Sequence, residues 1–100
     1  MSRPDLPLIL SPRAEDDFAH ILQYTLETWG ETQVFLCRAV LDQALLTIQQ
    51  NPNIGHNRPE LSLAHRIFPA GRHIIVYRVN DRAVHVSRIL HERMDIGRHL

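Results

Sequence analysis

The side chains best suited to chemistry are histidine and arginine residues in the second half of the chain. His91, Glu92 and Arg93 are consecutive, and four more arginines lie in nearby segments. These are Arg66, Arg72, Arg78 and Arg88. Cleavage of an RNA phosphodiester needs a general base, cations for the developing charge and a general acid. The candidates for these three roles are His91, Arg88 and Arg66.

The alternative is a basic surface that binds a target without catalysis. Such a surface would comprise Arg72, Arg78, Arg88, His91 and Arg93. We favour this interpretation, because a single histidine among arginines is not a catalytic motif. No Phe, Tyr or Trp follows Tyr77, so the C-terminal end lacks the aromatic platform on which RNA bases usually stack.

The residue spacing favours neither a metal site nor a reactive thiol. His85 and His91 would share one face of a strand but lie about 20 Å apart, and no second ligand set accompanies them. Cys37, the single cysteine, stands among large apolar residues, so we expect a buried structural thiol and no disulfide. No metal or cofactor is expected.

Composition and charge limit the class of protein. The 100 residues, 44% of them hydrophobic, are expected to form one domain, residues 1–100. We find no apolar stretch of membrane-spanning length and no secretory signal, which favours the cytoplasm. Residues 1–51 contain three arginines and seven acids, a net charge of −4, whereas residues 52–100 contain eight arginines and four acids, +4. This asymmetry indicates a basic sheet surface facing an acidic partner or a nucleic acid.

The basic residues would be positioned by a β-hairpin between Arg72 and Asp95. Two runs rich in Val, Ile and Tyr flank Asn80-Asp81, a turn-prone pair. A two-residue loop would pair Ile75 with Val86 and Tyr77 with Val84, whereas a three-residue loop would shift the pairing by one. With the two-residue loop, one face carries Ile75, Tyr77, Val79, Val84, Val86 and Leu90.

Two helices are predicted before the hairpin. Ser11-Pro12 is typical of a helix start, the acidic residues 15–17 suit the first turn, and Gly30 is typical of a helix end. Trp29 is expected to pack in the core at the helical corner, the alternative being an exposed anchor. The second helix runs from about residue 31 to 50, and its broad apolar surface predicts burial on two sides. Asn51-Pro52 stops it.

The remaining elements complete a small α+β domain. Residues 6–10 form a plausible first strand, which Pro7 restricts to an edge position or a strand start. Residues 64–68 are expected to form a strand and residues 69–71 a turn. The predicted order is β-α-α-β-β-β, with an antiparallel two-helix hairpin packed on a small, mainly antiparallel four-stranded sheet.

The chain resembles the ParE branch of the RelE/ParE toxins through motifs that run along nearly its whole length. The motifs are Leu10-Ser11-Pro12-Arg13-Ala14-Glu15-Asp16-Asp17, Trp29-Gly30-Glu31, Asn51-Pro52-Asn53-Ile54-Gly55, Arg58-Pro59-Glu60-Leu61, Tyr77-Arg78-Val79 and Arg88-Ile89-Leu90-His91-Glu92-Arg93-Met94-Asp95. Each is weak alone, but the ordered series is specific. The resemblance implies the RelE/ParE-like fold and a toxin of a type II toxin–antitoxin, or plasmid-stabilisation, module.

The same resemblance implies partners. An antitoxin, which we expect to be acidic, would fold its flexible C-terminal segment over the toxin. The apolar candidates for that contact are Phe35, Leu36, Val40 and Trp29. ParE-like toxins are associated with DNA gyrase, whereas RelE-like toxins cleave mRNA on the ribosome. A gyrase-binding inhibitor is therefore the first hypothesis and a ribosome-dependent endoribonuclease the second.

Overall fold

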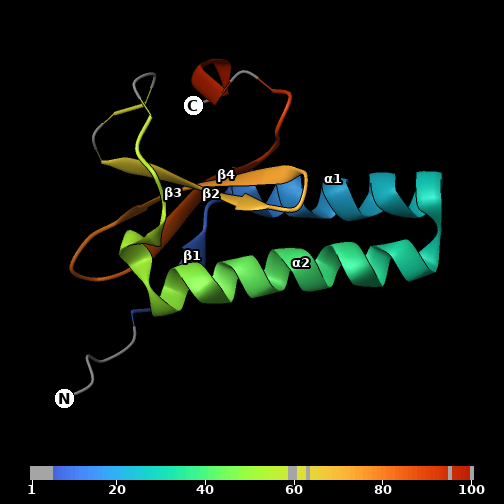
Figure 1. Ribbon diagram of the computed structural model, residues 1–100, viewed down its shortest axis with the longest axis horizontal. Coiled ribbons are helices and arrows are strands. Elements are labelled where there is room, and N and C mark those ends of the chain that lie inside the picture. The colour runs from blue at the N-terminus through green and yellow to red at the C-terminus, as the bar shows by residue number, and fades with distance from the viewer. Residues whose placement is uncertain (1–5, 59–60, 63, 95, 100) are drawn as a thin grey trace.

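The computed structural model describes residues 6–58, 61–62, 64–94 and 96–99. Its helices and strands follow the predicted order (Figure 1). They are β1 (Leu8–Leu10), α1 (Pro12–Trp29), α2 (Glu31–Gln50), β2 (His65–Ala70), β3 (His73–Val79) and β4 (Val84–His91). Short 3-10 turns occupy Pro52–Ile54 and Ile96–Arg98. The motif residues Pro59, Glu60 and Asp95 lie outside the described residues.

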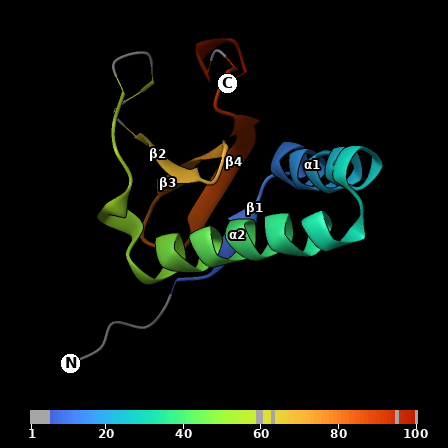
Figure 2. The same cartoon turned by 45° about the vertical axis from the view of Figure 1, so that its right-hand side comes forward.

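The helices begin and end where the local sequence predicts. The Ser11 side chain accepts a hydrogen bond from the backbone N–H of Ala14 at 3.0 Å and so caps α1. Gly30 separates the helices at φ +90°, a conformation that favours glycine. Figures 1 and 2 show the corner between α1 and α2 extending beyond the sheet.

The four strands form one mixed sheet in the order β1-β4-β3-β2. The pairs β2–β3 and β3–β4 are antiparallel, and β1 lies parallel to β4 at one edge, as Pro7 led us to expect for this segment. The predicted turn at residues 69–71 is wrong in part. Pro69 and Ala70 pair with Ile74 and His73 and therefore extend β2.

The β3–β4 connection differs from the predicted two-residue loop. Val79 pairs with Val84, so residues 80–83 form the connection. Tyr77 consequently pairs with Val86, and the predicted Tyr77–Val84 and Ile75–Val86 pairs are wrong. The shift is two residues, and a shift of two keeps each side chain on its own face. The residues near the turn that were predicted to share a face therefore do share it, although the predicted strand pairing is wrong.

A β-bulge at Ser87 then exchanges the faces of the last part of β4. Beyond the bulge Ile75 pairs with Ile89, so Ile89 joins the core under the helices, while Leu90, predicted for that core, packs on the opposite face. The residue that precedes α1 hydrogen-bonds to β4 at this bulge. Ser11 Oγ donates to the Ser87 carbonyl oxygen at 2.8 Å, and Ser11 N donates to the Val86 carbonyl oxygen at 2.9 Å.

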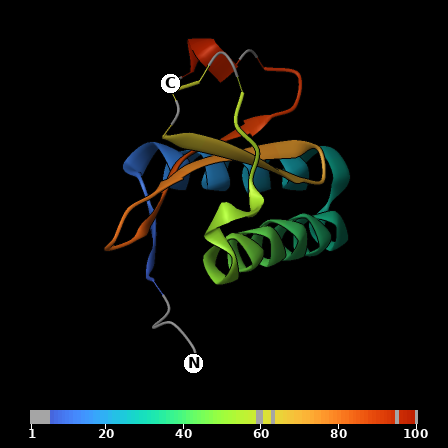
Figure 3. The ribbon, with the colours of Figure 1, turned by 60° about the vertical axis from the view of Figure 1, so that its left-hand side comes forward.

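Both faces of the sheet are partly covered, as Figure 3 shows: the helices lie on one side and the C-terminal segment on the other. The main core lies between helices and sheet. Its buried residues are Ala14, Leu41, Ala44, Leu45, Ile48, Ala70, Ile75, Tyr77, Val84, Val86 and Ile89. A smaller cluster lies on the opposite face and comprises Leu61, Ile67, Ile74, Val76, Leu90 and Ile96.

Tyr77 fastens the turn after α2 to the sheet. Its hydroxyl donates to the Pro52 carbonyl oxygen at 2.7 Å and accepts from Gly55 N at 2.8 Å. Arg66 Nη1 donates to the carbonyl oxygen of the same Gly55 at 2.9 Å. Burial raises the pKa of Tyr77, against the opposing effects of the Gly55 hydrogen bond and the charge of Arg66. The phenol therefore stays protonated and available as a donor.

Candidate functional site

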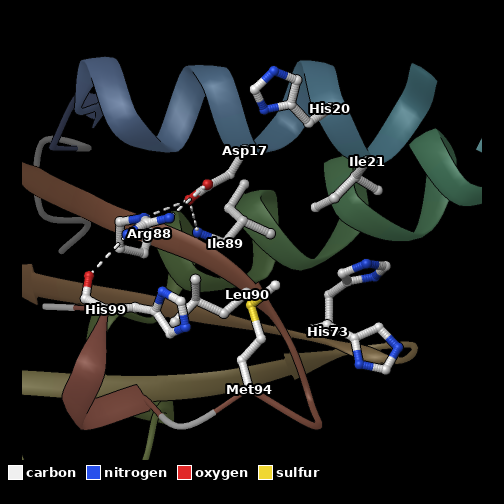
Figure 4. Close-up of a pocket in the computed structure, with 10 residues that line it drawn as sticks. Asp17, His20, Ile21, His73, Arg88, Ile89, Leu90, Met94 and His99 are labelled. Carbon is white, nitrogen blue, oxygen red and sulfur yellow. Dashed lines mark hydrogen bonds and ion pairs between the residues drawn. The ribbon is translucent and has the colours of Figure 1, made fainter. Parts of the chain in front are cut away.

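A pocket of about 200 Å³ lies between α1, the start of β3 and the end of β4 (Figure 4). Of the basic residues predicted for the site, Arg88 and His91 line it. Its lining residues are Asp17, His20, Ile21, His73, Arg88, Ile89, Leu90, His91, Met94 and His99. Helix α1 supplies one wall, strand β4 the base, and the C-terminal segment the other wall.

β1 pairs with β4 only as far as Val86, and Asp17 lies beside the next part of the β4 edge. Its Oδ2 accepts hydrogen bonds from Ile89 N at 2.9 Å and from Arg88 Nε at 2.8 Å, and its Oδ1 accepts from Arg88 Nη2 at 2.9 Å. The remaining guanidinium nitrogen, Nη1, donates to the His99 carbonyl oxygen at 2.8 Å. The carboxylate therefore replaces a neighbouring strand for Ile89 and holds Arg88 in a bidentate pair.

The Asp17–Arg88 pair is mostly buried, with the two side chains 13% and 15% exposed. Burial alone would raise the pKa of Asp17, but the hydrogen bonds from Arg88 and Ile89, together with the positive charges of Arg88 and His20, hold that pKa below its usual value. The hydrogen bond to Asp17 raises the pKa of Arg88 against the effect of burial. Both groups stay charged at neutral pH, and each neutralises the other.

Two histidines meet at the other end of the pocket. His73 and His91 are directly paired on β3 and β4, and their rings form an edge-to-face contact with centroids 5.6 Å apart. Burial and the neighbouring His91 lower the pKa of His73, although Glu92 opposes this. His91 Nδ1 accepts a hydrogen bond from Arg93 N at 3.1 Å, which requires that nitrogen to be unprotonated.

The three residues expected to serve an endoribonuclease are not assembled into one centre. Arg66 and His91 lie at different heights in the sheet. Arg66 pairs with Tyr77, which in turn pairs with Val86, and Val86 precedes His91 by five residues on β4. This separation is about 16 Å along the strand. Arg88 is engaged by Asp17. His91 is therefore left without a free guanidinium from either predicted partner.

The wider set of basic candidates divides between the two ends of the sheet. Arg72, His91 and Arg93 lie at one end, where the Arg72 carbonyl oxygen also accepts from Glu92 N at 2.9 Å. Arg78 lies at the other end, paired with His85. Both Arg72 and Arg93 are exposed, whereas Arg88 is mostly buried.

Sequence reasoning missed His73 and the role of Asp17. His73 faces His91 only because of the strand register, which the bulge at Ser87 sets. Asp17 was interpreted as a first-turn carboxylate complementing the helix dipole, an effect that would require no partner on β4. Its position five residues after Pro12, where the helix begins, carries no signal for Arg88, which lies 71 residues away.

The second candidate surface is the helical hairpin. Phe35, Leu36, Val40 and Trp29 are 74%, 56%, 45% and 71% exposed. The expectation that Trp29 packs in the core is therefore wrong, because the helical corner extends past the sheet and nothing in the described chain covers it. Cys37 is only partly buried and packs against the core, where Thr25 Oγ1 lies 3.9 Å from its sulfur.

The exposed apolar side chains of α2 lie on two different flanks of the helix. Val40 lies beside the β2–β3 turn, since a Cβ on Gly71 would approach its Cγ1 to 3.4 Å. Leu36, four residues earlier, shares that flank, whereas Phe35 is rotated away by about 100°. Between the helices runs an open groove of about 450 Å³. Its lining residues are Leu10, Glu15, Phe18, Ala19, Leu22, Arg38, Asp42 and Leu45.

Residues 6–58, 61–62, 64–94 and 96–99 contain neither a metal-binding cluster nor a membrane-spanning helix. No cluster of three or more His, Cys, Asp or Glu side chains in these ranges has a geometry that could hold a metal ion. Neither helix in them is long and apolar enough to cross a bilayer.

Comparison with known proteins gives concordant results. Residues 8–96 match the family model described as ParE toxin of the type II toxin–antitoxin system parDE. Toxin ParE1 of Mycobacterium tuberculosis is 34% identical over 93 residues, covering 92% of this chain and 95% of that protein. Toxin ParE1 of Caulobacter vibrioides is 32% identical over 94 residues, covering 94% and 97%.

A solved structure supports the fold independently. The chromosomal ParDE TA system from P. aeruginosa contains a chain that superposes with a TM-score of 0.74 at 18% identity, covering 86% of this chain and 95% of that one. At this identity the likeness concerns the fold alone. It agrees with the two-helix, four-stranded α+β architecture that the sequence predicts.

Proposed function

Because the chain belongs to the ParE toxin family of type II toxin–antitoxin systems, we propose that it acts in the cytoplasm by binding DNA gyrase, without catalysis, until an acidic antitoxin neutralises it. The observation that carries the non-catalytic part is the state of Arg88. Its guanidinium is engaged by Asp17 and by the His99 carbonyl oxygen. It is therefore not free to stabilise a phosphorane beside His91.

The exposed end of the sheet next to the pocket is the surface we assign to the target. Arg72, His91 and Arg93 supply donors there, and Met94, 45% exposed, adds an apolar contact. Arg88 contributes by fixing β4 against α1 through Asp17. Arg78 lies at the opposite end, so any contact that it makes with the target belongs to a wider footprint.

The gyrase proposal predicts accumulation of cleaved DNA. Purified, antitoxin-free protein added to gyrase and a relaxed plasmid is expected to reduce supercoiling and to yield linear DNA after denaturation. His91→Ala and Arg93→Ala should each weaken this effect only several-fold, because binding energy is spread over the surface. Gel electrophoresis of the plasmid measures both quantities.

The endoribonuclease alternative predicts a different pattern. Removing a general acid or base typically costs about 10²–10⁴-fold, so His91→Ala alone would abolish toxicity in that case. Normal supercoiling in the presence of a protein that still arrests growth would reject gyrase as the target. An assay of mRNA cleavage on ribosomes would then be decisive.

For the antitoxin we propose the outer face of the helical hairpin. Trp29 and Phe35 are the two most exposed large apolar side chains of the described residues. Phe35 lies three and seven residues before Arg38 and Asp42, which line the groove between the helices, so helical spacing places it on the same flank of α2. An amphipathic antitoxin helix would bury these aromatic rings in the groove-docking mode. Since the first half of the chain is net negative, the acidic residues of the antitoxin would contact the arginines of the second half instead.

This assignment predicts hot spots at the helical corner. Trp29→Ala and Phe35→Ala should each weaken antitoxin binding by about 10- to 100-fold, as measured by titration calorimetry with the cognate antitoxin. Tyr24→Ala is the matched control, because Tyr24 is 65% exposed but lies five residues from Trp29, on the other flank of α1. Loss of affinity in Leu36→Ala and Val40→Ala with no loss in Trp29→Ala would place the antitoxin on the opposite flank.

A further inference from the structure

A row of basic and titratable side chains crosses the sheet on the face away from the helices. His65 on β2 pairs with Arg78 on β3, and Arg78 pairs with His85 on β4. Arg78 alternates with Tyr77, whose side chain lies in the core under the helices, so the row faces the opposite side. With strands about 4.8 Å apart, the row spans about 10 Å. It lies beyond Ile67 and Val76 of the small cluster, near the β3–β4 turn.

The row has little acidic compensation. Arg78 and Arg82, the latter in the adjoining turn, are both exposed, and neither forms an ion pair with any residue in the described ranges. The described acids of the second half are Asp81, in the same turn, and Glu92, beyond the far end of β4. The two guanidinium groups are therefore available to an anion that lies across the row.

Hydrogen bonds hold the two imidazoles in defined orientations. Asn80 Oδ1 accepts from Arg82 N at 2.8 Å and from Ala83 N at 3.0 Å, so its amide nitrogen is the group that lies 3.3 Å from His85 Nε2. His85 Nδ1 then carries the proton in the neutral ring. Ser62 Oγ lies 2.7 Å from His65 Nδ1 and leaves Nε2 of that ring for an outside partner.

The surroundings of the row favour phosphate over a protein partner. The exposed large apolar residues of the described chain lie on β1, on the two helices or at Met94, and none belongs to the row. Protein interfaces depend on buried aromatic and apolar anchors, whereas a nucleic-acid backbone requires only cations and donors. No Phe, Tyr or Trp belongs to the row, so any stacking on bases would be limited to imidazole and guanidinium planes and would be tolerant of base sequence.

We propose that His65, Arg78, Arg82 and His85 form a surface that binds the phosphate backbone of nucleic acid regardless of base sequence. The surface lies at the opposite end of the sheet from Arg72, His91 and Arg93 and contains none of the apolar residues assigned to the antitoxin. It would hold the toxin on DNA near its target, and its strength would depend strongly on salt.

The test is fluorescence anisotropy of a labelled 20-base-pair duplex titrated with the full chain, free of antitoxin, from about 25 to 150 mM NaCl. Each phosphate contact contributes about −0.9 to the slope of log K against log salt. Two arginines predict a slope of about −1.8 at neutral pH. Two unrelated duplex sequences should give the same values.

Matched variants locate the site. Arg78→Gln and Arg82→Gln should each reduce the magnitude of the slope by about 0.9 and weaken both duplexes equally. Arg13→Gln makes the same charge change at an exposed position on α1 and should leave binding unchanged. Absence of salt-dependent binding, or equal losses in Arg13→Gln and Arg78→Gln, would overturn the proposal. Tighter binding of polyglutamate than of the duplex at matched charge would also overturn it, in favour of an acidic protein partner.

Discussion

Replacing Asp17 with alanine is expected to lower the free energy of unfolding by about 3 kcal/mol. The variant leaves the guanidinium of Arg88 mostly buried without a counter-charge and removes the acceptor of Ile89 N. Unpaired charges and donors of this kind are among the most costly defects in a folded protein. Urea unfolding followed by circular dichroism measures the change.

Two control variants separate the charge from the contact. Arg88→Met should cost less than Asp17→Ala, because it leaves the carboxylate with the Ile89 donor and with His20 nearby. The double variant should be more stable than the sum of the two single effects predicts, since the lone buried charge is then absent. Strict additivity would show that the pair is not coupled.

The pH dependence of this effect has a defined sign. The folded-state pKa of Asp17 lies below its unfolded value, so the carboxylate contributes stability that is complete above the unfolded pKa of about 3.9. The difference in unfolding free energy between the parent protein and Asp17→Asn should therefore be constant near neutral pH. It should shrink as pH falls through the folded-state pKa. A difference that grows on acidification would contradict this assignment.

Replacing Gly55 with alanine is the second large effect, expected at about 3 kcal/mol of destabilisation. A Cβ at this position would lie 2.5 Å from the Tyr77 hydroxyl oxygen and 2.9 Å from the Ile67 backbone oxygen. Neither atom can move freely, because the phenol is fully buried and the carbonyl belongs to β2. Thermal and urea unfolding should both report the loss.

Two comparisons test the cause. Gly71→Ala, at φ +62° but with its nearest neighbour at 3.4 Å, should cost only about 1 kcal/mol. Tyr77→Phe should cost about 2 kcal/mol by leaving Gly55 N and the Pro52 oxygen unpaired. Combined with Gly55→Ala it should cost about 1 kcal/mol less than the sum, since both changes break the same contact. Equal costs at Gly55 and Gly71 would refute the steric explanation.

The helices were predictable because their signals are local. The Ser11 cap, the Gly30 corner and the Asn51-Pro52 stop act within a few residues of themselves, and all three are confirmed. The α+β class followed from these boundaries together with the run of strands after them. The edge position of the first strand followed from proline, which cannot donate to a neighbouring strand.

The features that failed depend on contacts distant in the sequence. The bulge at Ser87, which sends Ile89 rather than Leu90 into the main core, is the point where Ser11 binds β4. No local rule places it. The candidate catalytic residues were grouped by type and nearness in the chain, but the Arg88 guanidinium is held by Asp17, 71 residues away. Charge composition alone could not distinguish an arginine that binds a partner from one that joins two elements of the fold.

The pairing of β1 with β4 has a consequence for the order in which the molecule is made. β1 pairs with β4, and Ser11, at the start of α1, hydrogen-bonds to Ser87, 76 residues away. A ribosome releases the N-terminus first, so β1 and the start of α1 have no docking site until β4 emerges. Translation that stops before Val84 would thus leave the first strand and helix unanchored. Premature termination would produce a chain without a complete fold rather than a shortened toxin.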